Sequence, residues 1–218
     1  MQIAILLYEN MTALDVVGPY QVLVNLPGAD VRLVAAEVGS VRSDTGMCIV
    51  ADSTFADVPN PDIILIPGGL DSSHATDEVT LKWICTAHEN TTWTTSVCTG
   101  ALILGQAGIL SGLPAATHWN VFPALAAQNA VPVSNRWVKV HDGKIITSAG
   151  VSAGIDMALY LAELLAGTEV AQTIQLCIQY DPQPPFDTGS PATATAQMIA
   201  DARAIFSERR HNLGLPNS

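Results

Sequence analysis

The sequence predicts an α/β fold, a three-layer sandwich in which a mostly parallel sheet is covered by helices on both faces. Short β-branched apolar runs alternate with helix-length amphipathic segments, which is typical of this class. The strand-like runs are continuously hydrophobic, as expected for strands that are buried on both faces. With 218 residues, of which 49% are hydrophobic and 13% charged, the chain is long and apolar enough to bury a core of this kind.

Each element follows from its local pattern. The predicted strands are Gln2–Tyr8, Val31–Ala36, Asp62–Ile66, Trp93–Val97 and Lys144–Thr147, with one or two outer strands in Val131–Val140. The predicted helices are Pro19–Leu26, Asp77–Glu89, Thr99–Ala107, Val121–Gln128, Ser152–Leu165 and Thr168–Gln179. Thr76, Ser152 and Thr168 are the expected N-caps, and Gly108 follows the helix at 99–107.

The composition changes after Tyr180. Residues 181–191 contain four prolines and exclude a regular helix or a central strand, so we expect a crossing loop. A last helix is predicted at about Thr193–Arg210. We therefore expect a single domain over residues 1–192, with a C-terminal helix and tail, residues 193–218, packed on it.

Charge and cysteine content exclude several function classes. Nine Lys and Arg residues against 20 Asp and Glu give a net charge of −11, which disfavours binding to nucleic acid or anionic membranes. The four cysteines lack the spacing of a metal site or a disulfide framework. We expect no metal, no membrane span and a cytoplasmic protein. Three of the cysteines are expected in the core: Cys48, Cys85 and Cys177.

The fourth cysteine, Cys98, lies in the turn between a predicted strand and a predicted helix. A thiol at a helix N-terminus is expected to have a lowered pKa, because the unpaired N–H groups favour the thiolate. The N–H groups of Thr99 and Gly100 would then form an anion site. The position resembles a nucleophile elbow with Cys in place of Ser. The alternative is that Cys98 is a small buried apolar residue.

Two further segments follow strands that are expected to end at the same crevice. Asp15 either caps the next helix or meets Cys98, in which case burial and like charge would raise the pKa of its carboxyl group. The turn that contains Gly69 and Leu70 brings backbone N–H groups to a small ligand or is an ordinary strand-end turn.

His118 and Gly150 complete the candidate set. His118 offers either a base for a Cys–His dyad or a structural side chain beside Trp119. Gly150 lies at another strand-to-helix crossing, where small residues allow close packing.

Together, these motifs resemble the DJ-1/PfpI superfamily nearly end to end. The segments that carry the resemblance are Asp15-x-x-Gly18-Pro19, Pro67-Gly68-Gly69, Ser96-Val97-Cys98-Thr99-Gly100, Thr117-His118-Trp119 and Gly150–Asp156. Thr99 departs from the protease branch, which has a histidine after the nucleophile, and Asp15 departs from DJ-1, which has a glutamate. The chain is most similar to the isonitrile hydratase branch, including its late segment 184–191.

This resemblance implies a flavodoxin-like fold, a homodimer, no cofactor, and hydration of an isonitrile to the N-substituted formamide. It implies that Cys98 is the nucleophile, that Asp15 is its acid/base partner, and that Thr99 shapes the anion site. The alternatives are an amidase, peptidase or glyoxalase-like enzyme that uses His118, and a redox or ligand sensor in which Cys98 is oxidised.

Overall fold

The computed structural model describes residues 1–140 and 143–215, so the last three residues of the predicted C-terminal tail lie outside the described part. The chain forms two compact units, Met1–Ile178 and a second that begins at Gln179. All candidate site residues predicted from the sequence lie in the first unit. The expectation that the C-terminal helix packs on the main domain stays a prediction.

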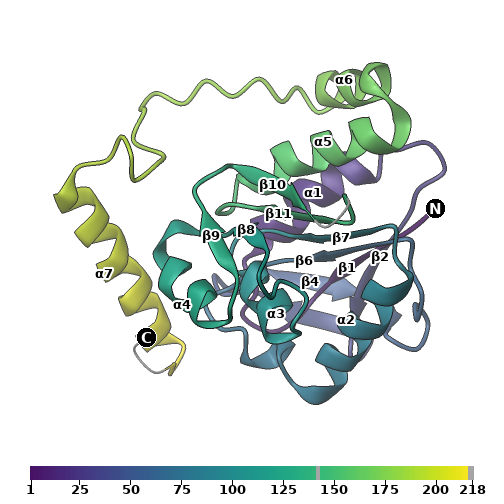
Figure 1. Cartoon of the computed structure of the whole chain (residues 1–218), viewed down its shortest axis with the longest axis horizontal. Coiled ribbons are helices and arrows are strands. Elements are labelled where there is room, and N and C mark those ends of the chain that lie inside the picture. The colour runs from purple at the N-terminus through teal and green to yellow at the C-terminus, as the bar shows by residue number, and fades with distance from the viewer. Residues whose placement is uncertain (141–142, 216–218) are drawn as a thin grey trace. The chain divides into compact units, whose positions relative to one another are not determined.

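The first unit is built on a seven-stranded sheet in the order β10-β11-β7-β6-β1-β2-β5, and all neighbouring strands are parallel except β10 and β11. Figure 1 shows α1 and α5 on one face of this sheet and α2 and α3 on the other. The predicted α/β sandwich is therefore confirmed. The strands of this sheet are β1 (Gln2–Leu6), β2 (Asp30–Ala35), β5 (Ser53–Thr54), β6 (Ile63–Ile66), β7 (Trp93–Ser96), β10 (Trp137–Val140) and β11 (Ile145–Ser148).

Two strand pairs lie outside the main sheet: an antiparallel hairpin, β3 (Gly39–Arg42) with β4 (Cys48–Ala51), and a parallel pair, β8 (Pro114–Ala116) with β9 (Val131–Val133). β3, β4, β5 and β8 were not predicted, because these strands are short and lack the continuous apolar run that marks the core strands.

The helices of the first unit are α1 (Ala13–Leu23), α2 (Glu78–Asn90), α3 (Gly100–Gln106), α4 (Phe122–Ala127), α5 (Ala153–Ala166) and α6 (Thr168–Cys177), with 3₁₀ turns η1 (Ser73–Ala75) and η2 (Trp119–Val121). Residues 181–191 contain neither helix nor strand, as predicted, and the second unit carries α7 (Ala196–Asn212). No helix among the described residues combines the length and apolarity needed to cross a bilayer.

Helix α1 begins six residues earlier than predicted, so that Pro19 lies inside it. A proline within a helix removes one backbone hydrogen bond and costs about 3 kcal/mol. Packing outweighs this cost here. Val16 and Val22 are buried, and Gly18 lies so close to α5 that a Cβ atom would be 2.9 Å from Ile155.

Several smaller predictions were wrong. The N-cap of α2 is Asp77 rather than Thr76, and its carboxylate accepts the N–H groups of Val79 and Thr80. Gly167 precedes α6, and the hydroxyl of Thr168 donates to Glu163 instead of capping the helix. Ser152 holds the N-cap position of α5 but makes no side-chain cap. The two core cysteines predicted at 48 and 177 are exposed, because β4 is an edge hairpin and the face of α6 that carries Cys177 is open.

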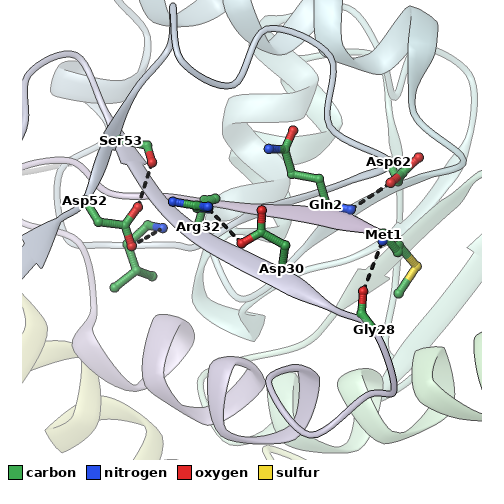
Figure 2. A network of polar contacts seen from close by, with 9 residues as sticks. Met1, Gln2, Gly28, Asp30, Arg32, Asp52, Ser53 and Asp62 are labelled. Carbon is green, nitrogen blue, oxygen red and sulfur yellow. Dashed lines mark hydrogen bonds and ion pairs between the residues drawn. The ribbon is translucent and has the colours of Figure 1, made fainter.

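Polar contacts hold the amino-terminal ends of the strands in register (Figure 2). The N–H of Gln2 at the start of β1 donates to Asp62 (2.7 Å), which precedes β6. The terminal ammonium donates to the Gly28 carbonyl (3.1 Å), and Arg32 pairs with Asp30 on β2. These groups are exposed and each stabilises the fold only modestly. The candidate site lies at the opposite edge of the sheet, where the parallel strands have their carboxyl ends.

Candidate active site

The candidate site lies at the carboxyl ends of three adjacent strands, β1, β6 and β7. The next strand, β2, pairs with one side of β1, and β6 pairs with the other side. The strand order therefore reverses at β1. In open α/β sheets, ligands bind in the crevice at such a reversal. Asp15 follows β1, Gly68 and Gly69 follow β6, and Cys98 follows β7.

Cys98 occupies a sharp turn between β7 and α3. Its φ is 57°, which is uncommon for a residue with a side chain and matches the nucleophile elbow predicted from sequence. Two hydrogen bonds to the Cys98 backbone hold this conformation: the Cys98 N–H donates to the Ala149 carbonyl (3.0 Å), and the Cys98 carbonyl accepts the Thr117 hydroxyl (2.8 Å). The side chain is 5% exposed. A strained backbone that is fixed in this way is typical of functional sites.

Asp15 lies in the first turn of α1 and is fully buried, so it does not cap that helix. Its Oδ2 accepts the Gly68 N–H (2.9 Å). Its Oδ1 accepts no N–H or O–H from the described residues, and the Cys98 thiol is the neighbouring side chain whose proximity lowers the pKa of the carboxyl group. Asp15 and Cys98 were predicted to meet at one crevice, and in the structure they lie close enough for each to shift the pKa of the other.

Burial raises the pKa of the Asp15 carboxyl from 3.8 to about 7. The Gly68 N–H lowers this pKa, the negative charge of Asp44 raises it, and the neighbouring Cys98 thiol lowers it. The carboxyl group therefore changes protonation state near neutral pH, as an acid/base group must.

Burial also raises the pKa of the Cys98 thiol well above its usual value, and the charge of Asp15 raises it further. The N–H groups of Val151 and Thr99 act in the opposite direction. The expectation of a lowered thiol pKa was therefore wrong for the free protein. The helix-start donors are present, but burial and the carboxylate outweigh them, so that the thiol keeps its proton at neutral pH.

The two N–H groups near the thiol are also different from those expected. The Gly100 N–H donates to the Val97 carbonyl (2.9 Å) and is already paired. Val151, whose φ is 39°, supplies the second N–H beside that of Thr99. Gly100 has a packing role instead, because a Cβ there would be 2.2 Å from the Ile66 carbonyl oxygen.

Thr99 links the turn after β6 to the elbow. Its hydroxyl accepts the Gly69 N–H (2.8 Å) and donates to the Gly69 carbonyl (2.9 Å). The preceding glycine allows this approach, since a Cβ on Gly68 would be 2.5 Å from the Thr99 nitrogen. Gly68 and Gly69 therefore form part of the site, and half-buried Leu70 follows them.

His118 lies against Gly150, where a Cβ would be 2.5 Å from the imidazole Cδ2. Its Nδ1 accepts the Asn120 N–H (3.3 Å), and burial lowers its pKa, so the ring is neutral at pH 7. Besides burial, the groups that shift the pKa of the thiol are Asp15 and the N–H groups of Val151 and Thr99. These observations favour a carboxylate as the acid/base partner of Cys98.

Tyr8 and Asp44 were not among the predicted site residues. Thr117 and Val151 lie in segments that carry the family resemblance, but no site role was predicted for them. The Tyr8 hydroxyl donates to the Pro67 carbonyl (3.1 Å), and Asp44 accepts the Thr12 hydroxyl (2.8 Å). Tyr8 carried a signal, because a side chain with a polar tip ends an apolar strand that points to the crevice. Asp44 carried none, since its hairpin was not predicted.

No group of three or more His, Cys, Asp or Glu side chains within residues 1–140 and 143–215 is placed to hold a metal ion.

The cysteine elbow, the buried carboxyl group beside it and the order of the sheet strands are the features on which the resemblance to the DJ-1/PfpI superfamily depends, and comparison with known proteins leads to the same family. The DJ-1/PfpI family model matches residues 1–164, and the chain belongs to this family. It is 43% identical over 204 residues to the isonitrile hydratase of Pseudomonas putida, covering 93% of this chain and 89% of that protein.

Solved structures show the same fold. A THiJ/PfpI family protein from Pseudomonas syringae superposes with a TM-score of 0.87 at 38% identity, covering 95% of this chain and 88% of that one. Drosophila melanogaster DJ-1beta gives a TM-score of 0.74 at 23% identity, covering 82% and 97% of the two chains.

Proposed function

We propose that this protein is an isonitrile hydratase, a lyase that converts R–N≡C and water to the N-substituted formamide. The observation that carries the proposal is the buried Asp15–Cys98 pair, in which the carboxyl pKa lies at about 7. The 43% identity to an isonitrile hydratase over nearly the whole chain supports the choice of substrate.

In the first step, ionised Asp15 accepts the thiol proton as the Cys98 sulfur attacks the terminal isonitrile carbon. The resulting Asp15 carboxylic acid then protonates that carbon, which gives the thioimidate R–N=CH–S–Cys98. The proton removed from sulfur is the proton delivered to carbon, so the step balances. A carboxyl group whose pKa is near neutral pH is suited to both transfers.

The N–H groups of Thr99 and Val151 stabilise negative charge on sulfur as the thiol is deprotonated. The high pKa of the thiol in the free protein fits this sequence, because the proton leaves only when the sulfur attacks. Thr99 also fixes the Gly69 backbone through two hydrogen bonds.

In the second step, Asp15 activates water for addition to the C=N bond. Asp15 takes one proton from the water and passes it to the nitrogen, which gives the tetrahedral adduct R–NH–CH(OH)–S–Cys98. When this adduct collapses to R–NH–CHO, the C–S bond breaks and the hydroxyl proton goes to the departing sulfur, which regenerates the Cys98 thiol. The net reaction consumes one isonitrile and one water, so the proposal includes no cofactor. The small-molecule substrate and water are the only reactants.

The first experiment is incubation of the protein with cyclohexyl isonitrile while the formamide is followed by chromatography. Cys98→Ala is expected to abolish the product, whereas Cys85→Ala, which removes a half-buried thiol away from the site, retains activity. Full activity of Cys98→Ala would overturn the mechanism. No formamide from the parent protein with several isonitriles would overturn the function.

His118→Ala tests the dyad mechanism. We expect turnover to persist, because the Asp15 carboxyl group supplies the acid/base chemistry. Loss of turnover in His118→Ala together with retention in Asp15→Asn would favour an amidase-like or glyoxalase-like mechanism instead. A protein without turnover whose Cys98 is oxidised selectively and reversibly by dilute peroxide would be a sensor.

We also propose a homodimer that forms through α1. Leu14 and Val17 on α1 and Val24 at its C-cap are 41%, 38% and 42% exposed, and their intervals of three and seven residues put them on one side of the helix. Light scattering should give twice the mass of 22.9 kDa. Val17→Glu should yield the monomer, whereas Val50→Glu, on the exposed hairpin, should not. A monomeric parent protein would contradict the proposal.

We place the protein in a reducing compartment, the cytoplasm. Cys48, Cys85, Cys98 and Cys177 are all free thiols in the structure, and the mechanism needs Cys98 reduced.

A further inference from the structure

Tyr8 lies two residues after the end of β1 and is 4% exposed, and it has no part in the chemistry described above although it is near the catalytic pair. Its hydroxyl donates to the Pro67 carbonyl oxygen (3.1 Å). The Gly68 N–H, which donates to Asp15 Oδ2 (2.9 Å), belongs to the same peptide group as that carbonyl. The three groups therefore form one continuous hydrogen-bonded chain: Tyr8 hydroxyl, peptide 67–68, Asp15 carboxyl.

Hydrogen bonds that share a peptide group polarise one another. A donor on the carbonyl oxygen withdraws electron density from the peptide nitrogen, which makes its N–H a stronger donor. A stronger N–H stabilises the ionised carboxylate more than the neutral acid. We propose that Tyr8 is a positioning residue that acts through peptide 67–68 to orient the Asp15 carboxyl group and favour its ionised form.

The surroundings of Tyr8 keep it in the state that this role needs. Burial, followed by the charges of Asp15, Cys98, Asp44 and Asp71, raises the Tyr8 pKa well above 10.0, so its hydroxyl stays protonated and always donates.

Asp15 itself faces four groups: the Gly68 N–H, the Cys98 thiol, Asp44 in the turn between β3 and β4, and Tyr8. Asp44 raises the pKa of Asp15, and the Gly68 N–H opposes both that charge and burial. Tyr8 strengthens the opposing donor. Through this donor, Tyr8 is expected to keep the Asp15 pKa lower than burial and the charge of Asp44 would otherwise make it.

The test is Tyr8→Phe, which keeps the ring and removes the hydroxyl. Two measurements are made: titration of the Asp15 carboxyl by ¹³C NMR with Asp-labelled protein, the signal being assigned with Asp15→Asn, and the pH dependence of kcat/KM for isonitrile hydration. The Asp15 midpoint and the acid limb of the rate profile should both move up by about half a pH unit. The kinetic measurement rests on the proposed function, whereas the titration does not.

Thr95→Val is the matched control. The Thr95 hydroxyl donates to the buried Ile64 carbonyl (2.9 Å), a bond of the same kind that does not lead to Asp15. Its loss should lower the unfolding temperature without moving the Asp15 midpoint. An equal shift in Thr95→Val, or no shift in Tyr8→Phe, would overturn the proposal.

A second substitution keeps the test decisive where Tyr8→Phe does not fold. Site-specific replacement of Tyr8 with 3-fluorotyrosine makes the phenol a stronger donor and barely changes its size. The Asp15 midpoint should then move down. An upward shift or an unchanged midpoint would contradict the role given to Tyr8. A normal Asp15 response in a protein that forms no formamide would refute the hydratase and leave the role of Tyr8 intact.

Discussion

Asp15→Asn should stabilise the fold at neutral and alkaline pH while it removes activity. The carboxyl group ionises near 3.8 in the unfolded chain and near 7 in the folded protein. Between these values the folded protein keeps a proton that the unfolded chain has released, so rising pH favours unfolding. The stability associated with protonated Asp15 is complete below pH 3.8 and is lost as the pH rises to 7.

The magnitude follows from the shift of the pKa. Each unit corresponds to about 1.4 kcal/mol, so ionisation of the buried carboxyl group costs on the order of 4 kcal/mol of unfolding free energy by pH 7. An asparagine keeps an oxygen for the Gly68 N–H and carries no charge. Asp15→Asn should therefore gain stability over the parent protein steadily from pH 4 to pH 7, and the difference should level off above pH 7.

Urea unfolding at several pH values between 4 and 9, followed by circular dichroism, measures this difference directly. Comparison with the parent protein cancels the contributions of other carboxyl groups, including Asp57 and Asp77, whose pKa values are lowered by hydrogen bonds. Two stability curves that run parallel across this range would refute the reasoning, because they would show that Asp15 titrates alike in folded and unfolded chains.

Three further substitutions test the packing of the site and the fold. Gly68→Ala would place a Cβ 2.5 Å from the Thr99 nitrogen, so we expect a loss of about 1–3 kcal/mol in unfolding free energy and of about 100-fold in kcat/KM. The control Gly189→Ala, where a Cβ has open space, should change neither quantity. Near-parent turnover of Gly68→Ala would contradict this prediction. Thr99→Val leaves the N–H and carbonyl of Gly69 unpaired and should cost about 1–3 kcal/mol, measured by urea unfolding, with a drop in kcat. Asp77→Ala removes the α2 cap and should lower stability by about 1 kcal/mol with kcat/KM unchanged; a change in kcat/KM would tie α2 to the site.

The sheet and the elbow were predictable because their signals are local. A buried parallel strand must be apolar along its whole length, and a residue between such a strand and a helix must lie in the turn. Cys98 could therefore be placed from its neighbours alone. The start of α1 could not, since Pro19 is a local signal against helix that the packing of Gly18 on α5 overrides.

The protonation states were out of reach of the sequence for a different reason. The helix N-terminus is local and favours the thiolate, but burial and the Asp15 charge come from elements that are distant in sequence, and they reverse the sign of the shift. Asp44 adds to this through a hairpin that the pattern did not show. From the sequence, a helix-dipole argument identifies the N–H donors near a thiol. It does not show how deeply the thiol is buried, and burial decides how strongly those donors and nearby charges act on its pKa.

The raised pKa of the Cys98 thiol affects how the site operates. A permanently ionised Cys98 beside an ionised Asp15 would place two negative charges in a buried pocket, which is unfavourable without a cation. With both pKa values raised, the pair carries at most one charge at neutral pH, because the thiol keeps its proton and only the carboxyl group ionises. An uncharged substrate such as an isonitrile fits this arrangement, because the proton that leaves the thiol is the one that its carbon must gain.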